Sequence, residues 1–282
     1  MKIQWYPGHM TKAKRMMLED IRLIDLVIEL VDARIPMSSR NPDIDSLASN
    51  KSRLILLNKA DLADDKISDM WVDYFTGHNC HVVKLDSRNR GGMKSVQTAI
   101  AAACKEKKEK DRLKGIINRP VRAMVAGIPN VGKSTFINSY AGKSCAKTGN
   151  KPGVTKGKQW IRLNKDVELL DTPGILWPKF EDDKVGTDLA FIGSVNDQVI
   201  DLTALSVELI DFLKERYPGV IASRYACEEN EPVNILEEIA YKRGCLKKGG
   251  EPDFDKSVML FLDDFRSGKL GRISIETPSD YQ

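Results

Sequence analysis

The segment VRAMVAGIPNVGKSTFIN constrains the fold more than any other part of this chain. An apolar run from Val121 to Ala126, typical of a buried strand, leads directly into the pattern GxxxxGKS, which spans Gly127 to Ser134. The glycines allow a tight loop whose amide N–H groups point inward, and the helix that follows adds the positive end of its dipole. This order of strand, glycine-rich loop and helix predicts a site for the phosphate groups of a nucleotide.

Separate roles are expected for the residues of this loop. Lys133 would reach the terminal phosphates, and the hydroxyl of Ser134 would complete the coordination shell of a magnesium ion. The other residues expected to contact the nucleotide are Asn130, Val131, Gly132 and Thr135. The alternative is an ordinary glycine-rich turn before a helix, with no ligand.

A second apolar run ends in Asp171, Thr172, Pro173 and Gly174. At the carboxyl end of a strand beside the loop, Asp171 would hold magnesium through a water molecule, and the amide of Gly174 would bond the γ-phosphate and sense its loss. Thr155, in the basic loop between the two motifs, would lend its hydroxyl and carbonyl oxygens to the metal. The alternatives are that DTPG is only a turn and that a neighbouring hydroxyl takes the role of Thr155.

The sequence Asn58-Lys59-Ala60-Asp61 follows the apolar run LILL, where a parallel strand ends and ligands bind. The Asp61 carboxylate can accept both the ring N–H and the exocyclic amino group of guanine, whereas adenine presents no such pair of donors. Asn58 would fix the loop, and the aliphatic stem of Lys59 would cover the face of the base. This motif therefore favours GTP over ATP.

A further polar segment follows the apolar run from Val82 to Leu85. Ser87 would steady the base-binding loop, with Asp86 beside it. The alternative is that DSRN is simply a turn.

Short apolar runs alternate with helical patterns through the first part of the chain, which indicates a parallel sheet with crossover helices. The runs lie at 26–31, 54–57, 82–85, 121–126 and 167–170, and one long helix is expected over 93–114. Later apolar residues recur at helical spacing, over 202–213, 235–241 and 258–265. We therefore expect a mostly parallel α/β domain over residues 1–178 and a smaller all-helical domain over residues 179–282.

Charge and composition narrow the function further. The 282 residues carry a net charge of +4, but residues 119–178 are strongly basic and residues 179–282 are acidic, so a polyanion would be held mainly by the front of the molecule. Five cysteines without a CxxC pair argue against a disulfide framework and a zinc site. No stretch of about 18 apolar residues occurs, and the start MKIQWYPGHMTKAKR lacks an apolar signal core, so a cytoplasmic protein is expected.

The order of the motifs is the reverse of that in Ras-like GTPases, because NKAD and DSR precede GIPNVGKS and DTPG. A circular permutation explains this order. With the segments WYPGHMTKAKR and VDARIP, the chain resembles the circularly permuted GTPases of ribosome assembly over nearly its whole length.

The resemblance implies a permuted Ras-like P-loop domain that binds GTP or GDP with Mg²⁺, and a C-terminal helical domain that contacts RNA. It also implies late maturation of the large ribosomal subunit, with the subunit precursor, its rRNA and its ribosomal proteins as partners, and neither DNA nor a membrane.

Hydrolysis is expected to be slow in the isolated protein and stimulated by the ribosomal subunit. Ile175 stands where many GTPases place a glutamine that orients the attacking water. His9, in a Tyr-Pro-Gly-His loop, is a candidate for that role, and a surface or RNA-contacting histidine is an equal alternative. Related GTPases with asparagine at the position of Asn130 use a potassium ion, so K⁺ is a candidate cofactor there.

Basic residues around Trp160 and two clusters in the helical domain, YKRGCLKKGG and FRSGKLGR, are candidate RNA contacts, although solvated turns fit these clusters equally well. Tyr241 is expected in the core. Two other functions remain open: a GTP-binding adaptor with negligible hydrolysis, and a P-loop ATPase or kinase in which NKAD is accidental.

Overall fold

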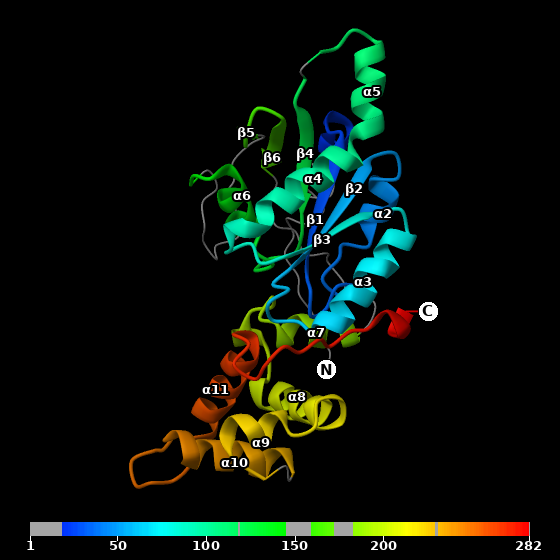
Figure 1. Cartoon of the computed structure of the whole chain (residues 1–282). Coiled ribbons are helices and arrows are strands. Elements are labelled where there is room, and N and C mark those ends of the chain that lie inside the picture. Colours follow the sequence, from blue (N-terminus) through cyan, green and yellow to red (C-terminus); the bar gives the residue numbers. More distant parts are fainter. Residues whose placement is uncertain (1–18, 118, 145–158, 172–182, 229–230, 282) are drawn as a thin grey trace. The chain divides into compact units, whose positions relative to one another are not determined.

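The computed structural model describes residues 19–117, 119–144, 159–171, 183–228 and 231–281. These residues form two compact units (Figure 1). We call them the sheet unit, which contains residues 19–171 and 274–281, and the helical unit, which contains residues 183–273. The expected domain boundary at residue 178 lies outside the described residues. The assignment of residues 274–281 differs from the expectation. The sequence placed them in the helical domain, whereas in the structure they belong to the sheet unit.

The sheet unit contains a six-stranded sheet in the order β3-β2-β1-β4-β6-β5. The strands are β1 (Leu26–Asp32), β2 (Ser52–Asn58), β3 (His81–Leu85), β4 (Val121–Ala126), β5 (Gln159–Arg162) and β6 (Val167–Asp171). All neighbouring pairs are parallel except β5 with β6. Each of the five predicted strands is present, and the short antiparallel edge strand β5 is an addition.

The register of the sheet brings the ends of three strands to one level. Asp32 at the end of β1 pairs with Asn58 at the end of β2, and Asn58 pairs with Leu85 at the end of β3. The segments that follow these strands therefore emerge side by side at the carboxyl edge of the sheet, which is where parallel α/β sheets bind ligands.

Five helices accompany the strands in the described part of the sheet unit: α2 (Asp43–Leu47), α3 (Asp65–Gly77), α4 (Met93–Ala103), α5 (Lys105–Leu113) and α6 (Lys133–Ala141). The single helix expected over 93–114 is interrupted at the buried Cys104, which leaves the helical conformation with φ −103° and ψ 9°. The charged segment beyond this point forms α5, in which no residue is buried.

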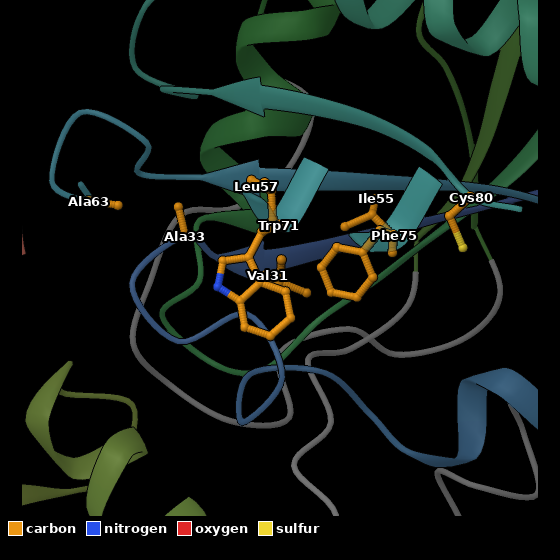
Figure 2. Close-up of a cluster of buried hydrophobic side chains, with 8 residues drawn as sticks. All are labelled: Val31, Ala33, Ile55, Leu57, Ala63, Trp71, Phe75 and Cys80. Atoms are coloured by element: carbon orange, nitrogen blue, oxygen red, sulfur yellow. The ribbon is translucent and has the colours of Figure 1, made fainter. Parts of the chain in front are cut away.

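Helix α3 covers one face of the sheet through two aromatic side chains. Trp71 and Phe75 are stacked with ring centroids 5.4 Å apart, and they pack on Val31, Ile55 and Leu57 of β1 and β2 (Figure 2). The start of α3 is fixed by Asp64, whose carboxylate accepts the N–H groups of the first turn. This cluster supports the ends of β1 and β2, and β2 leads directly into the NKAD segment.

The helical unit consists of α7 (Asp183–Phe191), α8 (Leu202–Arg216), α9 (Val220–Tyr225), α10 (Pro232–Arg243) and α11 (Phe254–Arg266) among its described residues. The three helices expected from apolar spacing correspond to α8, α10 and α11. Tyr241 is 53% exposed, so the expectation that it lies in the core is wrong. No helix in the described part of the chain is long and apolar enough to cross a membrane.

Candidate functional site

The loop between β4 and α6 requires glycine at two positions. Gly127 has φ +157°, and a Cβ there would lie 2.7 Å from the carbonyl oxygen of Leu30. Gly132 has φ +102°, and a Cβ there would lie 2.4 Å from Nδ2 of Asn58. Any larger residue at either position collides with a neighbouring strand end, so the loop is packed closely against β1 and β2.

Lys133 is the first residue of α6 and lies folded back over this loop. Its Nζ donates hydrogen bonds to the carbonyl oxygens of Gly127, at 2.8 Å, and Ile128, at 2.6 Å. Burial lowers the pKa of Lys133 to about 8, and none of the described carboxylates offsets the lost hydration of this ammonium. A phosphate group would supply the missing negative charge, so this ammonium is suited to an anionic ligand.

The helix behind Lys133 begins without a capping side chain, because its N-cap residue is Gly132. The half-buried Ser134 and Thr135 occupy its first turn. Amide N–H groups in a first turn lack partners within the helix and favour anions. Asn130 has a left-handed backbone with φ 60°, which turns the loop just before this helix start.

The buried Asn58 connects residues 58–61, the predicted base-binding loop, to residues 127–134, the predicted phosphate-binding loop. Its Nδ2 donates to the carbonyl oxygen of Val131 at 2.6 Å, and its Oδ1 accepts the N–H of Ser87 at 3.0 Å. Ser139 of α6 in turn donates from its hydroxyl to the carbonyl oxygen of Ser87 at 2.7 Å. Three segments that are distant in sequence are thus held together by one amide and one hydroxyl group.

Asp61 has one carboxylate oxygen in use and one available. Oδ2 forms an ion pair with Arg88, whereas Oδ1 is buried without a hydrogen-bond partner in the part of the chain that the structure describes. An ionised carboxylate oxygen without a donor is costly to bury. The ring N–H or amino group of guanine would supply that donor, so the orphaned oxygen fits the expected ligand.

Arg88 was not singled out from the sequence, although it contacts both carboxylates of the base-binding region. Its guanidinium pairs with Asp61 and also with Asp86, at 2.9 Å. Burial alone would raise the pKa of Asp86, but the hydrogen bonds from Arg88 lower it. Asp86 is thus paired with Arg88, whose side chain is 65% exposed.

Lys59 has a left-handed backbone with φ 57°, and its Nζ lies 3.0 Å from Oδ2 of Asp32. The next residue, Ala60, donates its N–H to the carbonyl oxygen of Leu85, so the loop is attached to the end of β3. Asp32 and its partner Arg34 belong to the VDARIP segment and were not predicted as site residues. The signal available in the sequence was their position directly after an apolar strand.

Several predicted residues lie outside the described part of the chain. These are His9, Thr155, Gly174, Ile175 and the side chain of Asp171, whose backbone ends strand β6. Among the described residues, the groups suited to a nucleotide are thus the phosphate-binding loop, the start of α6 and the base-binding loop. The hydroxyl of Ser134 is the described candidate for a magnesium ligand.

Comparisons with known proteins agree with this geometry. The family model described as "50S ribosome-binding GTPase" matches residues 122–237. Ribosome biogenesis GTPase A of Bacillus cereus is 47% identical over 100% of this chain and 96% of the relative, and that of Thermotoga maritima is 36% identical over 99% and 95%.

Solved structures give the same result. A GDP-bound YlqF structure has a TM-score of 0.69 and 30% identity, and the match covers 94% of this chain and 100% of that one. The GNP-bound YlqF from Thermotoga maritima has a TM-score of 0.67 and 32% identity over 95% and 98%. This chain belongs to the ribosome biogenesis GTPase A family, and it is a circularly permuted GTPase.

Proposed function

We propose that this GTPase binds the precursor of the large ribosomal subunit late in assembly and is released when GTP is hydrolysed. The observation that supports the proposal is the hydrogen bond between Asn58 and the carbonyl oxygen of Val131, which joins the NKAD segment to the GxxxxGKS loop. Both segments could then bind the same nucleotide. The match to a family described as 50S ribosome-binding, and relatives named for ribosome biogenesis, support the ribosomal part.

The nucleotide would act as the switch for binding and release. In this proposal Ser134 and Thr155 would bind Mg²⁺ directly and Asp171 would bind it through water, while the amide of Gly174 would contact the γ-phosphate. Loss of that phosphate releases the segments around Thr155 and Gly174, and these segments change their contacts with RNA. GTP then favours the bound state and GDP the free state, because each nucleotide stabilises a different arrangement.

Ile175, the residue after Gly174, cannot take part in hydrolysis through its side chain, so other groups would have to orient the attacking water. Ile175 cannot form a hydrogen bond to water, so the isolated protein is expected to turn over slowly and the ribosomal subunit to stimulate it. We assign the orientation of the attacking water to His9. We also assign a potassium site to Asn130, whose left-handed backbone turns the phosphate-binding loop.

RNA contacts of the helical unit would come from its exposed basic residues. Lys247 and Lys248 lie at the tip of a hairpin closed by the bridge between Leu246 and Pro252. Lys242 and Arg243 are exposed next to this tip, and the neighbouring Tyr241 is exposed enough to stack on an unpaired base. On an acidic unit, such a cluster is the part best suited to phosphate groups.

The switch is tested by co-sedimentation of the full chain with isolated large subunits, in GDP and in a non-hydrolysable GTP analogue. We expect stronger association with the analogue, and equal association in both nucleotides would contradict the proposal. The double substitution Lys247→Ala/Lys248→Ala should weaken association in both states. The matched control Lys105→Ala/Lys108→Ala removes two charges from the exposed helix α5 and should leave association unchanged.

Turnover measurements separate hydrolysis from simple binding. We expect phosphate release to rise when large subunits are added, and His9→Ala to reduce this stimulated rate without changing nucleotide affinity. Rates in potassium and sodium salts at equal ionic strength test the site at Asn130. Equal rates in the two salts would remove the potassium assignment, and no release with subunits present would favour the adaptor function.

A further inference from the structure

The C-terminal tail, residues 274–281, is packed into the sheet unit although the chain reaches it only after completing the helical unit. Four of its residues are buried: Ser274, Ile275, Glu276 and Pro278. The tail is too short to form a hydrophobic layer of its own, and its best-buried member is a carboxylate with no exposed surface. A buried carboxylate is retained only where hydrogen bonds compensate for its lost hydration, so its partners indicate what the tail does.

Glu276 holds the turn that follows β1. Its carboxylate accepts the N–H of Met37 at 2.7 Å and the N–H of Ser38 at 2.9 Å. The hydroxyl of Tyr281 donates to the same carboxylate at 2.7 Å. The backbone of the tail is fixed as well, because the indole N–H of Trp71 donates to the carbonyl oxygen of Glu276 at 3.2 Å.

The tail also contacts the backbone of the same turn at Arg34. The carbonyl oxygen of Arg34 accepts the N–H of Ile275 at 2.8 Å and that of Glu276 at 3.3 Å. The turn is therefore held at Arg34, at Met37 and at Ser38 by one short segment from the other end of the chain. Four hydrogen bonds from the tail end on the five turn residues 34–38, in addition to the bonds within the turn itself, so the tail restrains the conformation of this turn.

Arg34 passes this constraint to Asp32. The guanidinium is buried and donates from Nε to Oδ1 and from Nη2 to Oδ2 of Asp32, each at 2.9 Å. Such a two-point contact fixes the plane of the carboxylate as well as its position. Burial would raise the pKa of Asp32, but Arg34 and Lys59 hold it well below its usual range, so the carboxylate stays ionised.

Asp32 in turn holds Lys59 of the base-binding motif. Its Oδ2 lies 3.0 Å from Nζ of Lys59, whose side chain is 24% exposed. A lysine stem is otherwise free to rotate about several bonds, and an ion pair at its end selects one orientation. The register of β1 and β2, which aligns Asp32 with Asn58, makes this contact possible.

We propose that the C-terminal tail, acting through Arg34 and Asp32, positions Lys59 against the guanine base and thereby sets the affinity for the nucleotide. Glu276 and Asp32 are positioning residues, since of these three residues only Lys59 would touch the base. The inference rests on the assignment of Lys59 to base binding. It makes the end of the chain part of the nucleotide site, although this end follows the helical unit in sequence.

The test is a double-mutant cycle on the affinity of the full chain for fluorescent GDP. Glu276→Gln leaves one of the two turn N–H groups facing an amide N–H, and Asp32→Asn removes the charge that holds Lys59. We expect each change to raise the Kd for GDP by about fivefold, and by less than about twofold in a Lys59→Met background, because the effect passes through Lys59. The control Asp280→Asn, an exposed carboxylate of the same tail, should leave Kd unchanged.

Two outcomes would overturn the proposal. If Glu276→Gln and Asp32→Asn raise Kd equally with and without Lys59, the tail acts on general stability and not on the base. If Lys59→Met alone leaves GDP affinity unchanged, Lys59 does not bind the base. This single variant therefore separates failure of the base-binding assignment from failure of the proposed role of the tail.

Hydrogen exchange gives a second readout for variants too unstable for titration. The amide of Ala60 is bonded to Leu85 and that of Leu62 to Lys59. We expect Glu276→Gln to speed exchange at these two amides while α4 keeps its protection. Unchanged exchange at both amides would contradict the proposed link.

Discussion

Asn58 and Val131 are 73 positions apart in sequence and are joined by a hydrogen bond of 2.6 Å from Nδ2 to the carbonyl oxygen. The same side chain accepts the N–H of Ser87, and it is 1% exposed. Because the amide has one donor end and one acceptor end, both engaged, its orientation is fixed by its neighbours. The segment predicted to bind the base and the loop predicted to bind the phosphates are therefore linked through this one side chain.

Replacing Asn58 with alanine should weaken nucleotide binding and destabilise the sheet unit together. The change leaves the carbonyl of Val131 and the N–H of Ser87 without partners, and each buried unpaired group costs about 1–3 kcal/mol. We expect the Kd for GDP to rise by at least about tenfold and the melting temperature to fall, both measured on purified protein. Ser139→Ala, which removes only the outer hydrogen bond to Ser87, should have a smaller effect on both quantities.

Gly132→Ala should abolish nucleotide binding because its Cβ would lie 2.4 Å from Nδ2 of Asn58. Either the phosphate-binding loop or the side chain of Asn58 must then move. Gly142 offers a matched control: its φ is +68°, and no described atom lies within 4 Å of an added Cβ. We expect Gly142→Ala to cost only about 1 kcal/mol of backbone strain and to keep its GDP affinity in titrations. Equal GDP affinity in the two variants would contradict the packing argument.

Much of the sheet unit was predictable because its central strands are buried on both faces and read as continuous apolar runs. The edge strand β5 was missed, since QWIR is short and half polar. The interruption at Cys104 was also missed, because the apolar positions before it and the charged positions after it are both compatible with one helix. Tertiary contacts decide how long an edge strand is and which strand it pairs with, and the spacing of apolar residues does not reveal these contacts.

The candidate site was predictable where a motif carries its own chemistry, as in GIPNVGKS and NKAD. Arg34 and Glu276 were not predictable, because their roles depend on contacts between residues far apart in sequence. Asp32 required the register of β1 against β2, which places it level with Asn58. Arg88 was also not predictable, since it pairs with Asp61 only because the ends of β2 and β3 lie next to each other in the sheet.

Asp61→Asn should change the preferred base from guanine to xanthine. The carboxylate would accept two donors from guanine. An asparagine amide offers one acceptor and one donor instead, which complements the ring N–H and the exocyclic oxygen of xanthine. We expect GDP affinity to fall by about a hundredfold or more and xanthosine diphosphate to bind better than GDP in competition titrations. Asp69→Asn, an exposed carboxylate paired with Lys84, should keep the guanine preference. Unchanged selectivity in Asp61→Asn would exclude Asp61 as the base-reading residue.

Nucleotide affinity should decrease as the pH rises above about 8 because of Lys133. In the free protein burial lowers the pKa of Lys133 to about 8, below its ordinary value of 10.5, and a bound phosphate raises it again. Above pH 8, binding must therefore take up a proton, and the Kd for GDP should rise by up to about tenfold per pH unit. The free protein behaves oppositely, since folding favours the neutral amine and gains stability as the pH rises from about 8 towards 10.5. Lys133→Arg stays charged throughout, so its Kd should not show this loss, and ionisation of the guanine ring affects both proteins alike. Parallel Kd profiles for the two proteins would show that Lys133 keeps its proton in the free state and that burial does not control its charge.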